Sequence, residues 1–315
     1  MKDVIRIGTR GSALALWQAH HVANLLSQGG VSTEIIAIET QGDKILDRSL
    51  SKIGSKGVFT AELEDALYNH RIDIAVHSAK DLPSELPAGL EIIAFTERER
   101  VNDVLVSFNK SISLTDNKPW VIGTSSTRRI AMLQHYYPYL RTTDMRGNLQ
   151  TRMRKLQEGQ CDALLLAYAG VHRMNYDEHI VAYMPTDTFT PAVGQGSIAI
   201  EASESLEDTK RSKIRQLINH KTTEVVLRTE RAYLNRLQGG CSIPSFGLAT
   251  FSTSEDLVTL HAGIISLDGT RLVSKTLQQS SANAEIMGSQ MADEVLSSGG
   301  AEILRKIREQ QAVNK

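Results

Sequence analysis

The sequence has few of the features that mark metal, nucleotide or disulfide-stabilised proteins. Only two of its 315 residues are cysteines, Cys161 and Cys241, which excludes a disulfide framework and a cysteine-rich zinc site. It contains no Cys-x-x-Cys, His-Glu-x-x-His, Gly-x-Gly-x-x-Gly or Walker motif. We therefore expect neither a metal ion nor a nucleotide.

Long apolar runs and a strong charge of either sign are also missing. No run approaches the roughly 20 residues that span a bilayer, and the N-terminus lacks the apolar core of a signal peptide. A net charge of −1 provides no overall field that would attract nucleic acid or a membrane surface. We predict a cytoplasmic globular protein of about two or three domains.

A strand followed by a helix occurs twice in similar form. In both copies the strand ends in Ile-Gly-Thr, a polar turn bearing arginine follows, and a helical pattern then begins. A further pair of apolar runs is typical of buried parallel strands. The paired segments are 4–8 with 120–123, 13–26 with 130–135, and 73–81 with 162–170. Two related α/β lobes are predicted, either through duplication or because βαβ units share such patterns.

After Gly239 the pattern becomes that of a small α+β domain. Residues 246–277 alternate apolar and polar around an Asp268-Gly269 turn, which favours a hairpin. Residues 282–296 and 300–311 are predicted helices. The predicted domains are a first α/β lobe at 1–96 with about 197–215, a second α/β lobe at 101–192 with about 219–235, and a C-terminal α+β domain at 238–315.

Cys241 lies in the segment Leu-Gln-Gly-Gly-Cys-Ser-Ile-Pro at 237–244. Gly239 and Gly240 permit backbone angles that are closed to other residues, and Pro244 stiffens the exit from the loop. This arrangement favours an exposed thiol to which a ligand attaches covalently. The alternative is a small buried residue, because free cysteine is among the most buried residue types.

Several arginines follow predicted strands or begin predicted helices, where free N–H groups and a partial positive charge bind anions. They are Arg10, Arg128, Arg129, Arg146, Arg152 and Arg173. Ligands in open α/β sheets bind beyond the carboxyl ends of the strands, so we expect one cleft that binds several carboxylates. The serines and threonines beside these arginines alternatively serve only as helix caps.

Two further segments carry charged side chains suited to a ligand. Residues 49–57 are rich in Gly and Ser and contain Lys52 and Lys56, which predicts either a mobile lid or a plain solvated loop. Asp81 follows an apolar run that ends beside Ser78 and Lys80. A carboxylate there suits acid–base chemistry or stabilisation of a cation, and a salt bridge that caps the strand is the alternative.

Together these segments resemble the porphobilinogen deaminases, also called hydroxymethylbilane synthases. The resemblance rests on stretches in family order between residues 7 and 244: IGTRGSALALWQA, TQGDK, KGVFTAELEDAL, DIAVHSAKDLP, IGTSSTRR, RGNLQTR, DALLLAYAGVHR, PAVGQGSIAIE and GGCSIP. It implies a monomeric three-domain transferase of tetrapyrrole (haem) biosynthesis, whose two lobes resemble type II periplasmic binding proteins. Such an enzyme joins four porphobilinogen molecules head to tail and releases ammonia each time.

The resemblance also implies a cofactor and a set of site residues. One dipyrromethane, built from two porphobilinogen units, is expected on Cys241 through a thioether, and Asp81 matches the catalytic residue. The implied cofactor-binding residues are Ser78, Lys80, Thr124, Ser126, Arg128, Arg129 and Arg152. The implied substrate-binding residues are Arg10, Ser12, Gln18, Arg146, Arg173 and Gln195, and those of a mobile loop are Lys52, Lys56 and Phe59.

The chain departs from the family pattern at a few positions. Residues 98–103 read Arg-Glu-Arg-Val-Asn-Asp where the family often has Arg-Glu-Asp-Pro-Arg-Asp, which leaves the mobility of this linking segment open. Cys161 stands where an aromatic residue is common, and we expect it only to pack. One alternative is a two-lobed receptor for a carboxylated ligand, in which Asp81 and Cys241 would have no role. The second alternative is a family member that has lost its activity. The presence of every matched catalytic and attachment position disfavours it.

Overall fold

The computed structural model describes residues 4–44, 59–240, 242–252, 254 and 256–313. The chain divides into two compact units. Of the described residues, the first unit comprises 4–44, 59–99 and 196–224, and the second comprises those from 100 to 195 and from 225 to 313. The second unit includes the C-terminal sheet, and the three-domain boundaries predicted from the sequence stay a prediction.

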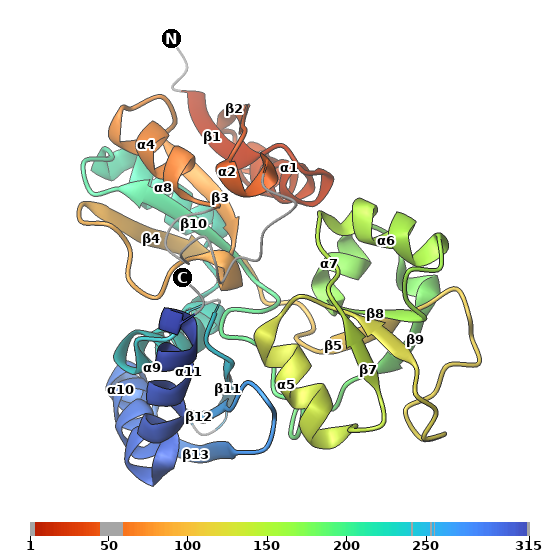
Figure 1. Cartoon of the computed structure of the whole chain (residues 1–315). Coiled ribbons are helices and arrows are strands. Elements are labelled where there is room, and N and C mark those ends of the chain that lie inside the picture. Colours follow the sequence, from red (N-terminus) through yellow and green to blue (C-terminus); the bar gives the residue numbers. More distant parts are fainter. Residues whose placement is uncertain (1–3, 45–58, 241, 253, 255, 314–315) are drawn as a thin grey trace. The chain divides into compact units, whose positions relative to one another are not determined.

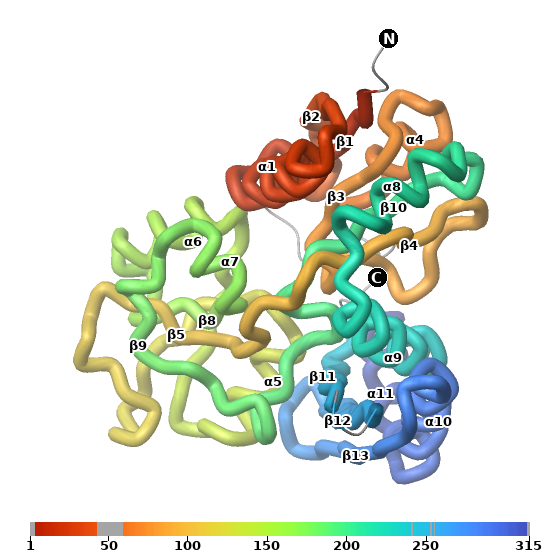
Figure 2. Tube along the Cα trace, turned by 180° about the vertical axis from the view of Figure 1, so that it is seen from behind, coloured from red at the N-terminus to blue at the C-terminus, as the bar shows by residue number. Residues whose placement is uncertain are grey.

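The sheet of the first unit has the strand order β2-β1-β3-β10-β4 (Figure 1). Its strands are β1 (Val4–Arg10), β2 (Ser32–Ile38), β3 (Ile74–Ser78), β4 (Leu90–Phe95) and β10 (Ile198–Ser203). Strand β1 is parallel to β2 and β3, whereas β10 is antiparallel to β3 and β4. Strand β10 thus joins this sheet from far along the chain, and both views place it among elements from the first hundred residues (Figures 1 and 2).

The first sheet of the second unit repeats this arrangement in the order β7-β6-β8-β5-β9. Its strands are β5 (Asp103–Val106), β6 (Val121–Gly123), β7 (Arg141–Thr143), β8 (Ala163–Ala167) and β9 (Ile180–Tyr183). Strand β6 is parallel to β7 and β8, and β5 is antiparallel to β8 and β9. The same order and directions in both sheets confirm the two related α/β lobes predicted from the sequence.

Helices cover both faces of each sheet because the strands alternate their apolar side chains between the two faces. In the first unit, α1 (Ala13–Gln28) and α8 (Asp208–Ile218) share one core cluster with the sheet, and α4 (Ala61–Tyr68) lies in the other cluster. In the second unit, α5 (Thr127–Tyr136) covers one face. The opposite face is covered by α6 (Leu149–Gln157) and α7 (Tyr168–Arg173). Short helical segments occur at α2 (Gln41–Lys44), η1 (Ala79–Asp81) and η2 (Asp177–His179).

The C-terminal part of the second unit is the predicted α+β structure. Strands β11 (Ser245–Ser252), β12 (Leu257–Ile265) and β13 (Leu272–Ser280) form an antiparallel sheet with the expected turn at Asp268-Gly269. Its helices are α9 (Lys221–Leu237), which enters this unit at Val225, α10 (Ala284–Val295) and α11 (Ala301–Val313). Short turns are η3 (Ser281–Asn283) and η4 (Leu296–Gly300). Gly299 separates the last two helices with a φ of 108°, at the break between the helices predicted at 282–296 and 300–311.

The repeated turns after β1 and β6 have a common structural cause. A Cβ on Gly8 would lie 2.3 Å from a methyl group of Ile72, and one on Gly123 would lie 2.9 Å from the Cys161 sulfur. The strand ends therefore pack too closely for any side chain. Ser12 and Ser126 then cap the following helices, because each hydroxyl accepts a hydrogen bond from a backbone N–H of the first turn.

The residues that depart from the family pattern between 98 and 103 have local partners in the second unit. The Arg100 guanidinium lies 3.9 Å from the centroid of the Tyr183 ring, a cation–π contact. The side-chain nitrogen of Asn102 donates to the carbonyl of Met184 at 2.8 Å. Two of the three departing side chains, Arg100 and Asn102, are thus tied to β9 and the residue after it.

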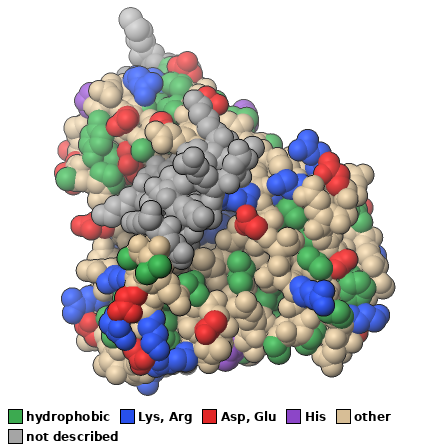
Figure 3. All heavy atoms as spheres, in the orientation of Figure 1, with side chains coloured by type: hydrophobic (Ala, Val, Ile, Leu, Met, Phe, Trp, Pro, Cys, Tyr) green, Lys and Arg blue, Asp and Glu red, His purple; other side chains and the backbone are tan. Residues whose placement is uncertain are grey.

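The exposed surface of the C-terminal helices mixes charges of both signs (Figure 3). Arg305 pairs with Glu309, and Lys306 pairs with Glu302. Among the helices of the described residues, none has the length and apolar character needed to cross a membrane. The same described residues contain no group of three or more His, Cys, Asp and Glu side chains that could hold a metal ion.

Cys161 packs inside the second unit, as predicted. It is buried with Met153, Leu156 and Leu164, and burial raises the pKa of its thiol to about 11. At pH 8 only about one thiol in a thousand would ionise, and the thiolate is the reactive form. We expect Cys161 in the folded Cys241→Ser variant to resist a disulfide-exchange reagent at pH 8, and to react at once in urea. Fast labelling of the folded variant would contradict this burial.

The same pKa shift predicts how pH affects stability at Cys161. The folded pKa of about 11 lies above the value of 9.0 for an exposed thiol. The group therefore favours the folded state below about pH 9 and loses this contribution as the pH rises through about 11. Comparing the alkaline unfolding midpoints of the Cys241→Ser variant with and without Cys161→Ala measures the effect.

Candidate active site

Arg128 and Arg129 share one carboxylate inside the second unit. They belong to the first turn of α5, and they are 4% and 7% exposed. Nη2 of Arg128 lies 2.6 Å from Oδ2 of Asp103, and Nη2 and Nε of Arg129 lie 2.7 and 3.1 Å from Oδ1. The two guanidiniums also donate to the carbonyls of Thr190 and Leu165, respectively. The predicted anion-binding arginines are thus held together at the start of one helix.

The charges of this cluster do not balance. Burial by itself would raise the pKa of Asp103, but the charges of Arg128 and Arg129 and their hydrogen bonds hold it well below its usual range. Burial also lowers the pKa of Arg128, an effect that Asp103 opposes. Two guanidiniums beside one carboxylate leave one positive charge in excess. A buried excess charge of this kind favours an anionic ligand.

The turn before α5 contains the predicted hydroxyl groups. Thr124 is 2% exposed, and its hydroxyl accepts a hydrogen bond from the backbone N–H of Ser126 at 3.3 Å. The Ser126 hydroxyl in turn accepts from the backbone N–H of Arg129. Both hydroxyls therefore cap the turn, which is the capping role given above as the alternative to ligand binding. Because a hydroxyl has one donor and two acceptor positions, capping leaves each able to donate to a ligand.

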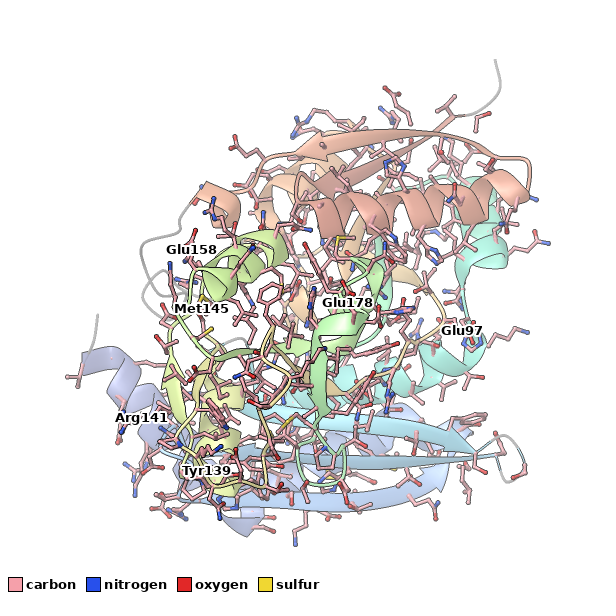
Figure 4. The ribbon with its side chains drawn as sticks, turned by 90° about the vertical axis from the view of Figure 1, so that its right-hand side faces the viewer. Glu97, Tyr139, Arg141, Met145, Glu158 and Glu178 are labelled. Atoms are coloured by element: carbon pink, nitrogen blue, oxygen red, sulfur yellow. The ribbon has the colours of Figure 1, made fainter. Side chains whose placement is uncertain are left out.

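Arg146 carries an unusual buried donor. It follows Met145, a core residue that anchors this segment in the second unit (Figure 4). Nη1 of Arg146 is buried and has no hydrogen-bond partner among the described residues. Nε of Arg152 donates to the carbonyl of Gly147 at 2.8 Å. An orphaned buried guanidinium nitrogen costs free energy unless an acceptor binds it, which a carboxylate would do.

In the first unit the structure brings Gln18 and Ser78 together. Nε2 of Gln18, from α1, lies 2.9 Å from the hydroxyl of Ser78 at the end of β3. The adjoining turn η1 carries Lys80 and Asp81, and its backbone is fixed by a hydrogen bond from Ala79 N to the carbonyl of Ser197 at 3.0 Å. Asp81 itself is exposed. Its carboxylate can therefore reach a ligand from a backbone held against β10.

Arg10 and Phe59 also lie together in the first unit. The Arg10 guanidinium is 4.3 Å from the centroid of the Phe59 ring. Arg10 ends β1, and Ser12 caps the helix that follows. The aromatic face thus supports a cation two residues before a helix N-terminus, which favours an anionic group at that point.

A buried polar pair joins β3 to β10. Nε2 of His77 is 3.0 Å from Oε2 of Glu201 in β10, and both side chains are nearly inaccessible. Glu64 of α4 is also buried, and burial raises the pKa of its carboxyl. His77 therefore points into the unit, and we assign it a structural role beneath the turn that carries Asp81.

Two further predicted residues, Arg173 and Gln195, are buried in the second unit. Arg173 in α7 is buried at 6% exposure, and Gln195 is 1% exposed with Nε2 lying 2.9 Å from Oδ1 of Asp103. The predictions for Lys52, Lys56 and Cys241 fall outside the described residues.

The sequence interpretation missed Asp103 as part of the site. The signal was present, because Asp103 begins the apolar strand Asp-Val-Leu-Val, and charged residues are seldom buried without a partner. The partners stand 25 and 26 residues farther along the chain. A local pattern does not reveal such a pairing.

Comparisons with known proteins agree with this chemistry. The family model "Porphobilinogen deaminase, dipyromethane cofactor binding domain" matches residues 5–211, and "Porphobilinogen deaminase, C-terminal domain" matches residues 225–297. The chain is 53% identical to the porphobilinogen deaminase of Cytophaga hutchinsonii over 308 residues, which is 98% of each chain. It is 52% identical to that of Desulfosudis oleivorans over 98% of this chain and 99% of the other.

Solved structures are more distantly similar. The methionine-binding protein MetQ aligns with a TM-score of 0.43 at 10% identity, over 67% of this chain and 90% of that one. The fold class therefore rests on the sheets described above. The family matches and the two relatives cover nearly the whole chain. The chain therefore belongs to the porphobilinogen deaminase family and has its activity and its dipyrromethane cofactor.

Proposed function

We propose that the residues predicted from the sequence carry out the condensation of four porphobilinogen molecules into hydroxymethylbilane. The observation that supports this most directly is the buried cluster of Arg128, Arg129 and Asp103 with its excess positive charge. Each porphobilinogen unit bears an acetate and a propionate. Guanidiniums neutralise such carboxylates with paired hydrogen bonds and do not lose their proton.

The cofactor is proposed to be attached at Cys241. When bound, dipyrromethane supplies the free pyrrole carbon to which the first porphobilinogen unit is joined. Arg128 and Arg129 bind its carboxylates through N–H groups that Asp103 and the two carbonyls do not use. Thr124 and Ser126 donate from the turn before the helix. Ser78, Lys80 and Arg152 complete the proposed set.

Asp81 is the proposed catalytic residue. Loss of ammonia from porphobilinogen leaves an electron-poor azafulvenium ion, whose ring nitrogen shares the positive charge. When a pyrrole carbon of the growing chain attacks it, the new carbon–carbon bond moves this charge to the attacking ring, which then loses its α-proton. The Asp81 carboxylate accepts the pyrrole N–H and stabilises that charge. Its exposure and the hydrogen bond that fixes η1 support this role, because the carboxylate is accessible while its backbone is held.

The incoming and growing chain is proposed to contact a second set of polar side chains: Arg10, Ser12, Gln18, Arg146, Arg173 and Gln195. The orphaned Nη1 of Arg146 supports a carboxylate contact at that residue. The hydrogen bond between Gln18 and Ser78 supports a shared role for these two side chains, since either can also bond to a ligand. Lys52, Lys56 and Phe59 are proposed to belong to a loop that covers the ligand.

We propose further that the protein acts as a monomer in the cytoplasm. Its substrate, porphobilinogen, is a small molecule, and no nucleic acid or membrane partner is invoked. Light scattering coupled to size-exclusion chromatography measures the oligomeric state, and a stable dimer would contradict the proposal.

Activity of the purified chain tests the proposed function. Incubation with porphobilinogen should release one ammonia for each porphobilinogen consumed, and four should be consumed for each hydroxymethylbilane formed. Ammonia release and product formation are measured in the same reaction. Failure to form product, despite a covalent adduct on the protein, would indicate a family member that has lost turnover. The receptor alternative predicts binding of porphobilinogen with no ammonia at all.

A further inference from the structure

We infer that Asp103 is a positioning residue, which holds Arg128 and Arg129 in the orientation that receives the cofactor carboxylates. This inference rests on the proposed role of the two arginines. Asp103 would not contact the cofactor. It would act through the two guanidiniums. Its hydrogen bonds to them would set the direction of their remaining N–H groups.

The hydrogen bonds of Asp103 account for both of its oxygens. Oδ2 accepts from Arg128, and Oδ1 accepts from Nε and Nη2 of Arg129 and from Nε2 of Gln195. The carboxylate has no exposed surface. All of its bonds therefore serve to hold neighbouring side chains, and none faces solvent.

The backbone beneath Asp103 is fixed as well. Asp103 begins β5 and stands opposite Ala167 of β8, and its carbonyl accepts a hydrogen bond from Met184 N at 2.8 Å. The arginines themselves are on α5, with Arg129 also bonded to the carbonyl of Leu165 in β8. The carboxylate and both guanidiniums are thus mounted on regular elements, which hold geometry better than loops do.

A donor count shows what the arrangement leaves for a ligand. Two guanidiniums carry ten N–H groups. Asp103, the two carbonyls and the sulfur of Met132 accept six of these hydrogen bonds. The remaining donors have no acceptor among the described residues. Because each guanidinium is planar, fixing one edge on Asp103 also fixes the direction of its other donors.

A neutral residue at this position would not give the same result. Without the carboxylate, two buried like charges would lie side by side and repel each other. In Asp103→Asn the amide has one acceptor oxygen and a donor group that faces other donors. The arginines would then turn away from one another, and the carboxylates of the cofactor would find no prepared site.

The test compares cofactor loading in Asp103→Asn, in Asp103→Glu and in the wild type. Each full-length protein is prepared without cofactor and incubated with porphobilinogen, and the covalent adduct is followed by intact mass. We expect Asp103→Asn to load about 100-fold more slowly than the wild type, the size of effect seen when one partner of a buried charge pair is lost. Asp103→Glu keeps the charge but displaces it by one methylene, and we expect loading to be about tenfold slower.

Asp73→Asn is the matched control. Asp73 is also a largely buried carboxylate that binds cations, Arg6 at 3.0 Å and Lys210 at 3.4 Å. It lies before β3, at the opposite end of that strand from Ser78. A purely structural role would give the control and the Asp103 variants similar losses of thermal stability and unchanged loading. We expect unchanged loading in Asp73→Asn alone.

Each outcome decides the matter. Wild-type loading in a folded Asp103→Asn protein would overturn the inference. If Asp103→Asn does not fold, Asp103→Glu decides, because wild-type loading in that variant would show that charge balance suffices without exact placement. If the wild type itself acquires no adduct, the proposed cofactor attachment fails first, and the inference fails with it.

Discussion

Replacing Cys241 by Ser is expected to remove the covalent cofactor and to abolish turnover. A thiol ionises near neutral pH and attacks an electrophilic carbon, whereas a serine hydroxyl without an activating base does not. The intact mass of the denatured wild type should exceed that of the bare chain by two linked pyrrole units. The variant should have the bare mass, and its rate of hydroxymethylbilane formation should fall below detection.

Cys161→Ser provides the control for Cys241→Ser. Cys161 is the buried thiol of the second unit, so its replacement should leave the adduct and the turnover in place. An adduct of the same mass on Cys241→Ser would place the attachment elsewhere and contradict the prediction. A wild-type protein with bare mass calls for incubation with porphobilinogen before measurement, because the protein without cofactor would then have been isolated.

Asp81→Asn is expected to lower kcat by about 100- to 1,000-fold, the loss typical of removing one group that stabilises developing charge. The amide preserves the shape of the side chain but not its negative charge. The pyrrole N–H would still find an acceptor, so KM should change little. Steady-state rates of ammonia release, normalised to the fraction of enzyme that carries the adduct, measure the effect.

Asp65→Asn is a suitable comparison for Asp81→Asn. Asp65 is an exposed aspartate of α4 in the same unit, and its loss removes the same charge from the surface. We expect near-wild-type kcat in that variant. Near-normal turnover in Asp81→Asn would remove Asp81 from the mechanism. Absence of the adduct in Asp81→Asn would instead assign the carboxylate to cofactor assembly.

Much of the fold could be predicted because its signals are local. The apolar runs at β3 and β8, the capping serines Ser12 and Ser126, and the turn at Asp268-Gly269 each depend on neighbouring residues. Backbone geometry and side-chain size determine these features within a few residues. The segments that resemble the porphobilinogen deaminases likewise identified the activity, which the family comparisons confirm.

Other predictions depended on the resemblance and not on local physics. From the residue pattern alone, Asp81 could be either a catalytic group or part of a salt bridge that caps the strand. The hydroxyls beside Arg128 could either bind the ligand or cap the helix. The structure shows that Ser126 does cap its helix, which leaves its second role a proposal. Neither reading excludes the other, because a capping hydroxyl retains a donor.

By itself, the sequence determined the α/β character of the lobes, the positions of their helix starts and the family. Only the tertiary structure decided which strands are neighbours. Strand β10 lies beside β3 in the first sheet, although it follows β3 by more than a hundred residues. Asp103 of β5 likewise contacts Arg128 and Arg129 of α5. Such pairings depend on the order of strands in the sheet and on the burial that this order creates, and no short stretch of sequence encodes either. The site therefore gained its buried carboxylate, and its excess positive charge, only when the chain folded.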